Sequence, residues 1–464
     1  MEKKDHLLLR EAIDKNNEHI EACIQEDITV ICINRENKVK KIISFRIMHQ
    51  NNNSFWLQNE TWEYFLSNDD FQKIINNVAQ KNQEKNYTVV ADVSEEPEEI
   101  NLNNGFGDEY TVIAAMAMPE RIKHLKEGKE RLDTLIAMKP RQEELITEAL
   151  VETTKETILH NHAAIMNALS LTNDEAKKNT QNLVDSTFDL VKSSAQLISN
   201  NIFNDDLMNT LVSKSNGTIL QHMTRVHLNG LAFLTYYNKL VSSSSAINKM
   251  RVNFASKFRS YYQLLLPNVE PDKITLEKVF LGGMRAVSEE NLYNWAVGFL
   301  IHDIGKAAAV EYHEGEEAYN REIVIEHVKV GYSSITTKTN YPRDAGLIAG
   351  YHHEYYGDSG GYGYFRSYLE QSRKTNPKLK QEFCITFEIE HMADCMAMSF
   401  FPAKVLEIID VYDSVTDPNR KYRKALNPEE ALAMMNEEFI VKHPKIDAII
   451  FDIFSKFVRE TQTA

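Results

Sequence analysis

A buried helix that ends in a histidine and an aspartate is the feature that most restricts how this chain can fold. The apolar run at 295–300 leads directly into His302 and Asp303. A buried imidazole needs partners for its nitrogens, and a buried carboxylate needs a cation or several donors. A divalent metal satisfies both, because neutral imidazole and ionised carboxylate are its usual ligands. Lys306 follows one helical turn after His302 and is expected to face the same site. Taken alone, such a pair is more typical of a capped helix end with a core histidine than of a metal site.

The composition excludes several classes of protein. The chain has 464 residues, enough for two or three domains, and a formal net charge of −15 without a long Lys/Arg block. This argues against binding to a nucleic-acid polymer, whereas a small anionic substrate needs only local positive charge. The four cysteines are too dispersed for a disulfide framework, and no targeting segment or membrane-crossing apolar span is recognised. We therefore expect a cytoplasmic protein without a membrane span.

Residues 1–118 are expected to form a small α/β domain. The segments 28–33 and 42–47 flank a polar turn and are typical of a β-hairpin. The other expected elements are a helix up to about residue 25, a helix at 61–79, and strands at 55–57, 88–93 and 110–117. The domain carries no ligand cluster and no phosphate-binding glycine pattern. A sensor or dimerisation module and a plain packing domain both remain open.

Residues 119–215 predict a helical linker. Apolar residues recur at helical spacing in three segments, 120–138, 141–169 and 174–200. One interpretation is a signalling linker that also forms the seam of a homodimer; the other is a set of core helices of the following domain. His160 and His162 lie two residues apart, hence on different helix faces, and are interpreted as surface or core histidines.

Residues 216–464 contain more ligand-type side chains, each at an end of an apolar helical segment or embedded in one. They are His222, His327, His352, His353 and Asp410. Together with His302 and Asp303 they exceed the needs of one tetrahedral site. They match the demand of two octahedral-leaning ions that share one carboxylate.

The order of these motifs, H…HDxGK…HxxxG…HHE…DVYD followed by the basic segment 419–426, resembles the HD-GYP branch of the HD phosphohydrolase superfamily. The resemblance covers approximately residues 216–445. It implies an all-helical HD-type domain that hydrolyses cyclic di-GMP by attack of a hydroxide bridging two metal ions. The expected fold class of the whole chain is therefore mainly α, with the HD-type domain at 216–464 preceded by the linker and the small α/β domain.

The resemblance also implies roles for individual residues. The metal ligands form two groups: His222, His302, Asp303 and Asp410 for one ion, and His327, His352 and His353 with the bridging Asp303 for the other. Lys306 would contact the scissile phosphate or help the leaving oxygen, so Asp303 and Lys306 are the expected catalytic residues. Arg420 and Arg423 would bind the other phosphate, a task that suits a guanidinium fork. Iron and manganese both suit these ligands.

The chain departs from the family pattern after the HHE motif. The family loop reads D-G-S-G-Y-P, whereas 357–363 exchanges the acid and the glycine, adds a glycine and lacks the proline. Substrate specificity is affected more than metal binding. Thr218 stands where three-metal members carry glutamate, so two ions are expected. Glu354 is either an orienting partner of a ligand or a solvated residue. Competing ligands are Asp394, beside His391, for Asp410, and His227 for His222.

Three functions are compatible with these motifs. The first is a metal-dependent phosphodiesterase in signal transduction that cleaves the cyclic dinucleotide to linear pGpG and further to GMP. The second is HD-type hydrolysis of another nucleotide, which the altered loop favours. The third is a receptor that binds a cyclic dinucleotide without cleaving it, and the complete ligand set counts against this reading.

Overall fold

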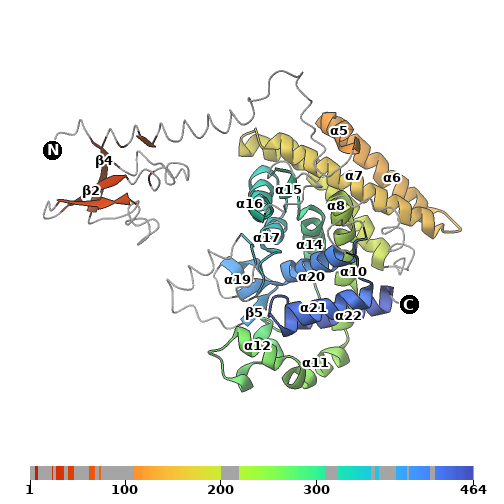
Figure 1. The fold of residues 1–464 in the computed structure, drawn as a ribbon. Coiled ribbons are helices and arrows are strands. Elements are labelled where there is room, and N and C mark those ends of the chain that lie inside the picture. Colours follow the sequence, from red (N-terminus) through yellow and green to blue (C-terminus); the bar gives the residue numbers. More distant parts are fainter. Residues whose placement is uncertain are drawn as a thin grey trace. The chain divides into compact units, whose positions relative to one another are not determined.

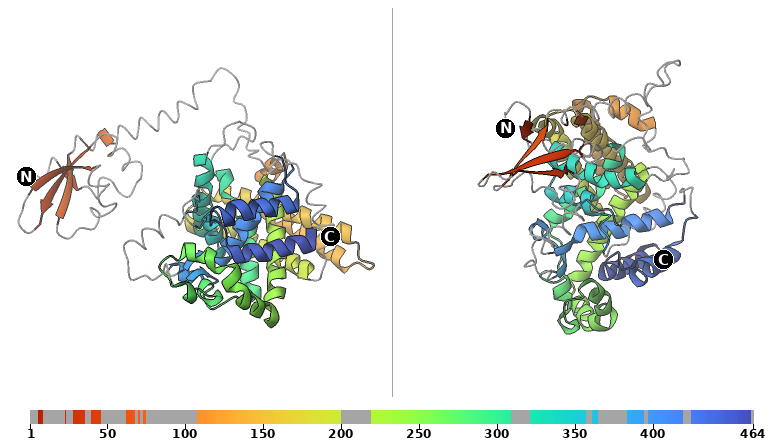
Figure 2. Two further views of the ribbon diagram at one scale, coloured as in Figure 1. Left: turned by 60° about the horizontal axis from the view of Figure 1, so that its bottom comes forward. Right: turned by 60° about the vertical axis from the view of Figure 1, so that its left-hand side comes forward.

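The computed structural model comprises two compact units, Met1–Asn101 and Leu102–Ala464, shown in Figures 1 and 2. The residues that it describes are 6–8, 23, 28–35, 40–45, 62–67, 70, 73–74, 108–199, 219–308, 321–356, 361–364, 383–393, 397–418 and 424–462. No helix in these ranges is both long and apolar enough to cross a membrane. The domain boundaries expected at residues 118 and 215 stay predictions.

The first unit contains a four-stranded antiparallel sheet. Its strand order is β1 (His6–Leu8), β4 (Trp62–Ser67), β2 (Thr29–Asn34) and β3 (Lys40–Ser44). Strands β2 and β3 pair Val30 with Ile43, which confirms the predicted hairpin. Among the other expected elements, 55–57 and 88–93 lie outside the described residues.

Three expectations for the N-terminal elements were wrong. A strand, β4, stands where the helix at 61–79 was expected to begin, because Tyr64 and Leu66 are buried while Glu63 and Phe65 are half-buried, a period of two. The strand β1 likewise lies within the expected first helix. The strand expected at 110–117 is mostly helix α5 (Asp108–Ala115), which buries Tyr110 and Ile113 three residues apart.

After α5, the second unit continues with three long helices, as predicted. They are α6 (Met118–Ala137), α7 (Glu143–Ala168) and α8 (Asn173–Ser199). Helices α7 and α8 pack against α10 (Ile219–Val241) and α14 (Glu289–Ile301), and residues of all four share one hydrophobic core. They are thus core helices of this unit, and His160 and His162 are buried on α7. The dimer seam stays a prediction.

Among the described residues, four further helices carry ligand-type residues or directly adjoin them in the sequence. These are α15 (Gly305–Ala308), α16 (Arg321–Lys338), α17 (Arg343–Tyr351) and α20 (Phe401–Thr416). Helix α14 is capped by Ser288, whose side chain accepts a hydrogen bond from the backbone N–H of Asn291. Helix α15 starts at a glycine because α16 lies against it: a Cβ on Gly305 would stand 2.0 Å from the carbonyl oxygen of His327.

Two stretches interrupt the series of ligand-bearing helices. The first holds α11 (Ser244–Lys257), α12 (Arg259–Leu265), the 3-10 turn Pro271–Lys273 and α13 (Leu276–Val279). The second holds β5 (Phe383–Thr386), α19 (Ile389–Ala393) and β6 (Ala397–Phe400). Because β5 and β6 pair in parallel, with Ile385 opposite Ser399, this part of the chain is mainly helical and not all-helical as expected.

The chain ends in α21 (Pro428–Asn436), a π-helical turn (Glu437–Val441) and α22 (Ala448–Gln462). Both α21 and α22 contact α20, and Figure 1 shows them beside it. Helix α20 also contacts α10 and α17, so it lies between helices that carry ligand-type residues from distant parts of the sequence.

Candidate metal centre

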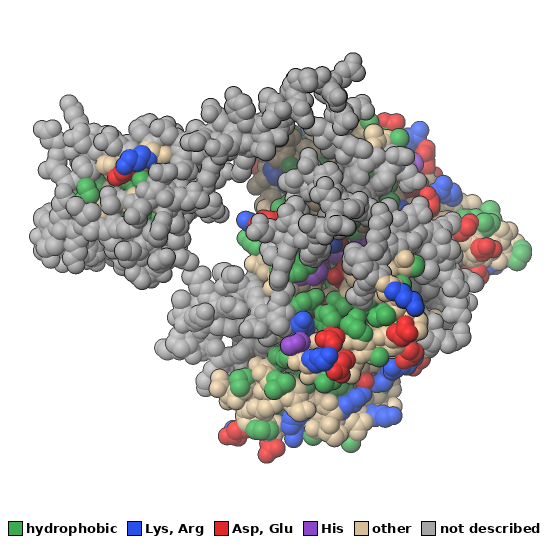
Figure 3. Space-filling view, viewed as in Figure 1, with side chains coloured by type: hydrophobic (Ala, Val, Ile, Leu, Met, Phe, Trp, Pro, Cys, Tyr) green, Lys and Arg blue, Asp and Glu red, His purple; other side chains and the backbone are tan. Residues whose placement is uncertain are grey.

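The fold brings the seven predicted metal ligands together. They are His222 on α10, His302 and Asp303 after α14, His327 on α16, His352 and His353 after α17, and Asp410 on α20. We call these seven residues the candidate metal centre. All are buried, with at most 7% of any of them exposed. Histidine and acidic side chains are visible together in the middle of the face that Figure 3 presents.

The ligand atoms form overlapping groups in which every pair lies within 4.8 Å. The groups are His222, His302 and Asp410; His302, Asp303 and His352; and His327, His352 and His353. The first and the last coincide with the two halves of the expected ligand set, and the middle one joins them.

Asp303 lies between the two halves. Its Oδ1 is 3.2 Å from Nε2 of His327 and 3.7 Å from Nε2 of His352. Its Oδ2 is 3.5 Å from Nε2 of both His222 and His302. Each carboxylate oxygen therefore faces a different pair of imidazoles, which is the arrangement that a bridging ligand requires.

Two of the histidines are oriented by their own helices. Nδ1 of His302 donates to the carbonyl of Phe299, and Nδ1 of His352 donates to the carbonyl of Ala349, each at 2.8 Å. Because a carbonyl only accepts, Nδ1 carries the proton and Nε2 is left with a lone pair. Among the described residues, Nε2 of His302 and of His353 has no hydrogen-bond partner. Buried nitrogens without a partner are costly, and a bound cation would satisfy them.

Three residues that the sequence analysis did not single out hold His222 in place. Nδ1 of His222 donates to Oδ2 of Asp413 at 2.7 Å. Arg225 donates to Asp413 from Nε (2.6 Å) and Nη2 (3.0 Å), and to Asp417 from Nη2 (2.7 Å). Spacing was the available signal, since Asp413 follows Asp410 by three residues on α20 and Arg225 follows His222 by three on α10.

The electrostatics keep the site in the protonation states that metal ligands need. Burial lowers the pKa of His302 to about 3 and also lowers that of His327, so both imidazoles are neutral. Burial alone would raise the pKa of Asp303, but the Lys306 ammonium holds it well below its usual range. The pKa of Asp410 is likewise lowered against the effect of burial, mainly by hydrogen bonding to His222. Neutral imidazoles and ionised carboxylates fit divalent transition ions.

His222 behaves differently when no ion neutralises its neighbours. Burial acts to lower its pKa, but hydrogen bonds to Asp303, Asp410 and Asp413 raise the pKa to about 10. The imidazolium thus compensates three buried carboxylates, and a cation bound at the centre would replace its proton on Nε2.

Lys306 lies at the edge of the centre. Its ammonium donates to Oδ2 of Asp303, and its side chain is 21% exposed while Asp303 is fully buried. It is therefore within reach of a group that approaches from solvent. Of the other residues singled out, Thr218, Asp394, Arg420 and Arg423 lie outside the described part of the chain.

The competing ligands in the described part do not join the centre. Nδ1 of His227 bonds to the carbonyl of Ala296 at 3.0 Å, and burial lowers the pKa of His227 to about 4, as for a core histidine. His391 bonds to Oγ1 of Thr386 at 2.9 Å. Neither histidine belongs to any of the ligand groups found among the described residues.

The end of the altered loop packs directly on the centre. Tyr362 donates its backbone N–H to the carbonyl of His353 at 3.0 Å and stacks its ring on the imidazole, with centroids 4.3 Å apart. A Cβ on Gly363 would stand 1.6 Å from Oε2 and 2.9 Å from Cβ of the buried Glu354. A side chain at Gly363 would therefore require the Glu354 side chain to shift. Residues 357–360 lie outside the described part.

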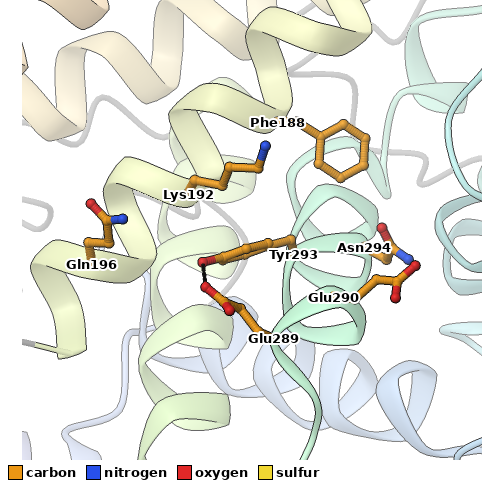
Figure 4. A pocket seen from close by; sticks show the side chains of 7 residues that line it. All are labelled: Phe188, Lys192, Gln196, Glu289, Glu290, Tyr293 and Asn294. Carbon is orange, nitrogen blue, oxygen red and sulfur yellow. Dashed lines mark hydrogen bonds between the residues drawn. The ribbon is translucent and has the colours of Figure 1, made fainter.

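A surface cavity of about 480 Å³ lies between α8 and the start of α14. Figure 4 shows its lining residues, with the Tyr293 hydroxyl donating to Glu289. None of the seven centre residues lines it, so the cavity is separate from the chemistry considered above. Comparison of the chain with protein-family models, with curated proteins and with solved structures finds no match.

Proposed function

We propose that this chain is a metal-dependent phosphodiesterase of the HD-GYP type, which opens cyclic di-GMP to linear pGpG and cleaves that product to GMP. The observation that supports it most strongly is the placement of Asp303, whose two oxygens face separate pairs of histidines. A carboxylate shared in this way can hold two ions at the short separation that two-metal hydrolysis of a phosphodiester uses.

Two divalent ions, iron or manganese, are the proposed cofactors. Their ligands would be His222, His302, Asp303 and Asp410 for one, and Asp303, His327, His352 and His353 for the other. When bound, such a pair supplies water of lowered pKa and stabilises charge on the phosphoryl oxygens. The chain itself presents neutral imidazoles whose orientation is set by carbonyls of α14 and α17, and carboxylates that are already ionised.

Lys306 is the proposed catalytic cation. Its ammonium lies against Asp303 and is partly exposed, so it can bind a phosphoryl oxygen of a substrate that enters from solvent. Charge on the leaving oxygen of the same phosphate grows as the P–O bond breaks, and a cation already in place beside that phosphate stabilises the charge without reorganisation. Arg420 and Arg423 remain the proposed ligands of the second phosphate.

Hydrolysis of another nucleotide is the second candidate function. It is favoured by the loop that packs on His353, because Gly363 stands where the family pattern has proline and Glu354 occupies the adjoining space. A change of loop shape beside the centre would alter which nucleotide fits. A receptor without activity is less consistent with seven buried ligands that all converge.

Turnover by metal-loaded protein tests the proposal. Protein purified without oxygen and loaded with Mn²⁺ or Fe²⁺ is incubated with cyclic di-GMP and with other cyclic mono- and dinucleotides, and products are separated by chromatography. We expect linear pGpG and GMP from wild type, and no product from the double variant that combines His302→Ala with Asp303→Ala. His443→Ala, at an exposed histidine, serves as the matched control. Turnover of a different nucleotide alone would support the second candidate, and turnover by the double variant would refute both.

A further inference from the structure

Lys404, in the first turn of α20, is completely buried and donates two hydrogen bonds. Its ammonium donates to the backbone carbonyl of Glu354 at 2.5 Å and to Oε2 of Glu407 at 2.7 Å. It also lies 4.1 Å from the ring centroid of Tyr356. Two oxygens and an aromatic face thus surround the ammonium. A buried ammonium is kept only where every donor is satisfied, so each of these contacts matters.

The contact with Glu354 links two parts of the candidate metal centre. Glu354 directly follows His353 in the turn after α17, where backbone carbonyls at the helix end lack helical partners. Lys404 lies on the same helix as Asp410, six residues before it. The lysine therefore connects the turn that carries two histidines to the helix that carries a carboxylate of the other ligand group.

Other contacts hold the same turn in the fold. The backbone N–H of Tyr356 donates to the carbonyl of Lys445 at 2.8 Å, and its hydroxyl donates to Asp447 at 3.3 Å. The backbone N–H of Tyr364 donates to the carbonyl of Gly350 at 2.8 Å. With these anchors in place, loss of the Lys404 contact is expected to change the spacing between the histidines and α20 without unfolding the unit.

We infer that Lys404 is a positioning residue of the metal centre: it tethers His352 and His353 to α20 and so sets their distance from Asp410. The inference rests on the proposed metal centre, but it does not depend on which nucleotide is cleaved. Lys404 touches none of the ligand atoms, and its effect passes through the carbonyl of Glu354.

The test distinguishes the hydrogen bond between Lys404 and Glu354 from the charge compensation between Lys404 and Glu407. Lys404→Met with Glu407→Met removes both polar groups, so neither is left buried without its partner. We measure binding of Mn²⁺ alone by titration calorimetry and by metal analysis, and thermal unfolding of the metal-free protein. We expect wild type to bind two ions. The double variant should unfold near the wild-type temperature but bind one of the two ions about 10- to 100-fold more weakly, the range typical of groups that orient metal ligands.

Two single variants sharpen the result. Lys404→Arg keeps a cationic donor for both acceptors, so its affinity for Mn²⁺ should lie closer to that of the wild type than to that of the double variant. Glu407→Gln keeps the contact between Lys404 and Glu354 and should bind both ions as wild type does. The inference is overturned if the double variant binds both ions with wild-type affinity. It is also overturned if that variant does not fold even in saturating Mn²⁺, because Lys404 would then support the fold itself.

The outcome is distinguishable from failure of the proposed function. Wild type that binds two Mn²⁺ ions but cleaves no cyclic nucleotide refutes the activity and leaves the role of Lys404 to be decided by the variants. Wild type that binds fewer than two ions refutes the dinuclear centre, and the inference about Lys404 with it.

Discussion

Replacement of Asp413 by asparagine is the most direct test of how this chain prepares a metal ligand. Asp413 accepts the Nδ1 proton of His222 and two hydrogen bonds from Arg225, all inside the protein. Asparagine keeps the shape but removes the negative charge, and its amide can present a donor to a nitrogen that itself donates. His222 is then free to rotate or to change tautomer. Rotation moves Nε2 away from the centre, and the other tautomer places a proton on Nε2, so either change weakens metal binding.

The magnitude follows from these contacts. Loss of a carboxylate that orients a ligating histidine weakens metal binding about 10- to 100-fold, which corresponds to roughly 1.4 to 2.7 kcal/mol. Buried hydrogen bonds to charged groups contribute about 1.5 to 3 kcal/mol each. Because Asp417 still accepts from Arg225, the metal-free Asp413→Asn protein should lose about 2 to 3 kcal/mol of unfolding free energy and remain folded.

The matched control is Asp417→Asn. Asp417, like Asp413, accepts a hydrogen bond from Arg225, but Nδ1 of His222 donates to Asp413. Both variants should therefore lose stability in urea titrations of the metal-free protein, whereas only Asp413→Asn should lose Mn²⁺ affinity in calorimetry. Equal Mn²⁺ affinity in the two variants would refute the argument, because Asp413 would then stabilise the fold without orienting His222.

Three further outcomes are expected. Lys306→Met should retain both Mn²⁺ ions but lose about 100-fold or more in kcat; unchanged kcat in steady-state assays would remove Lys306 from the mechanism. Gly363→Ala should lose about 1 to 3 kcal/mol in urea titrations, because the new Cβ overlaps the Glu354 side chain; wild-type stability would contradict that geometry. Burial, partly offset by Lys404, raises the pKa of Glu407 to about 8. As the pH rises, the Glu407 carboxyl loses its proton at a lower pH in the unfolded chain than in the folded protein. Between pH 5 and 8 the wild type should therefore lose stability relative to Glu407→Gln, by about 1.4 kcal/mol per unit of pKa shift. If the difference in unfolding free energy between wild type and Glu407→Gln does not change with pH, the raised pKa of Glu407 is refuted.

Long periodic segments were predictable from the sequence, and short apolar ones were not. Helices α6, α7 and α8 lie within a residue or two of the predicted ranges, because apolar residues at helical spacing over twenty or more positions fit no other element. Strand β4 and helix α5 have only six and eight residues, which is too few for the period to decide. The pairing of β5 with β6 depends on contacts with distant helices that no local pattern encodes.

In the candidate site, the metal ligands were predictable from the sequence, whereas the residues that position them were not. All seven predicted ligands converge, because each lies at an end of an apolar helix, or within one, that must be buried. Asp413 and Lys404 were missed as partners of these ligands, since a carboxylate or an ammonium on an amphipathic helix is usually solvated. Their roles depend on which helix packs opposite, and that information is tertiary. Asp413 follows the ligand Asp410 by three residues, but Glu407 precedes it by the same interval, so spacing alone does not identify which acid contacts His222.

Helix α20 explains how a single element can serve both halves of the centre. Lys404, Glu407, Asp410 and Asp413 follow one another at intervals of three residues. Each interval falls about 60° short of a full helical turn, so Lys404 and Asp413 point in roughly opposite directions from the helix axis. Because α20 contacts both α17 and α10, Lys404 meets the turn that carries His353, while Asp413 meets His222. Asp410 lies between them and faces the centre. A displacement of α20 would therefore move both ligand groups at once, whereas a displacement of α16 would move His327 alone.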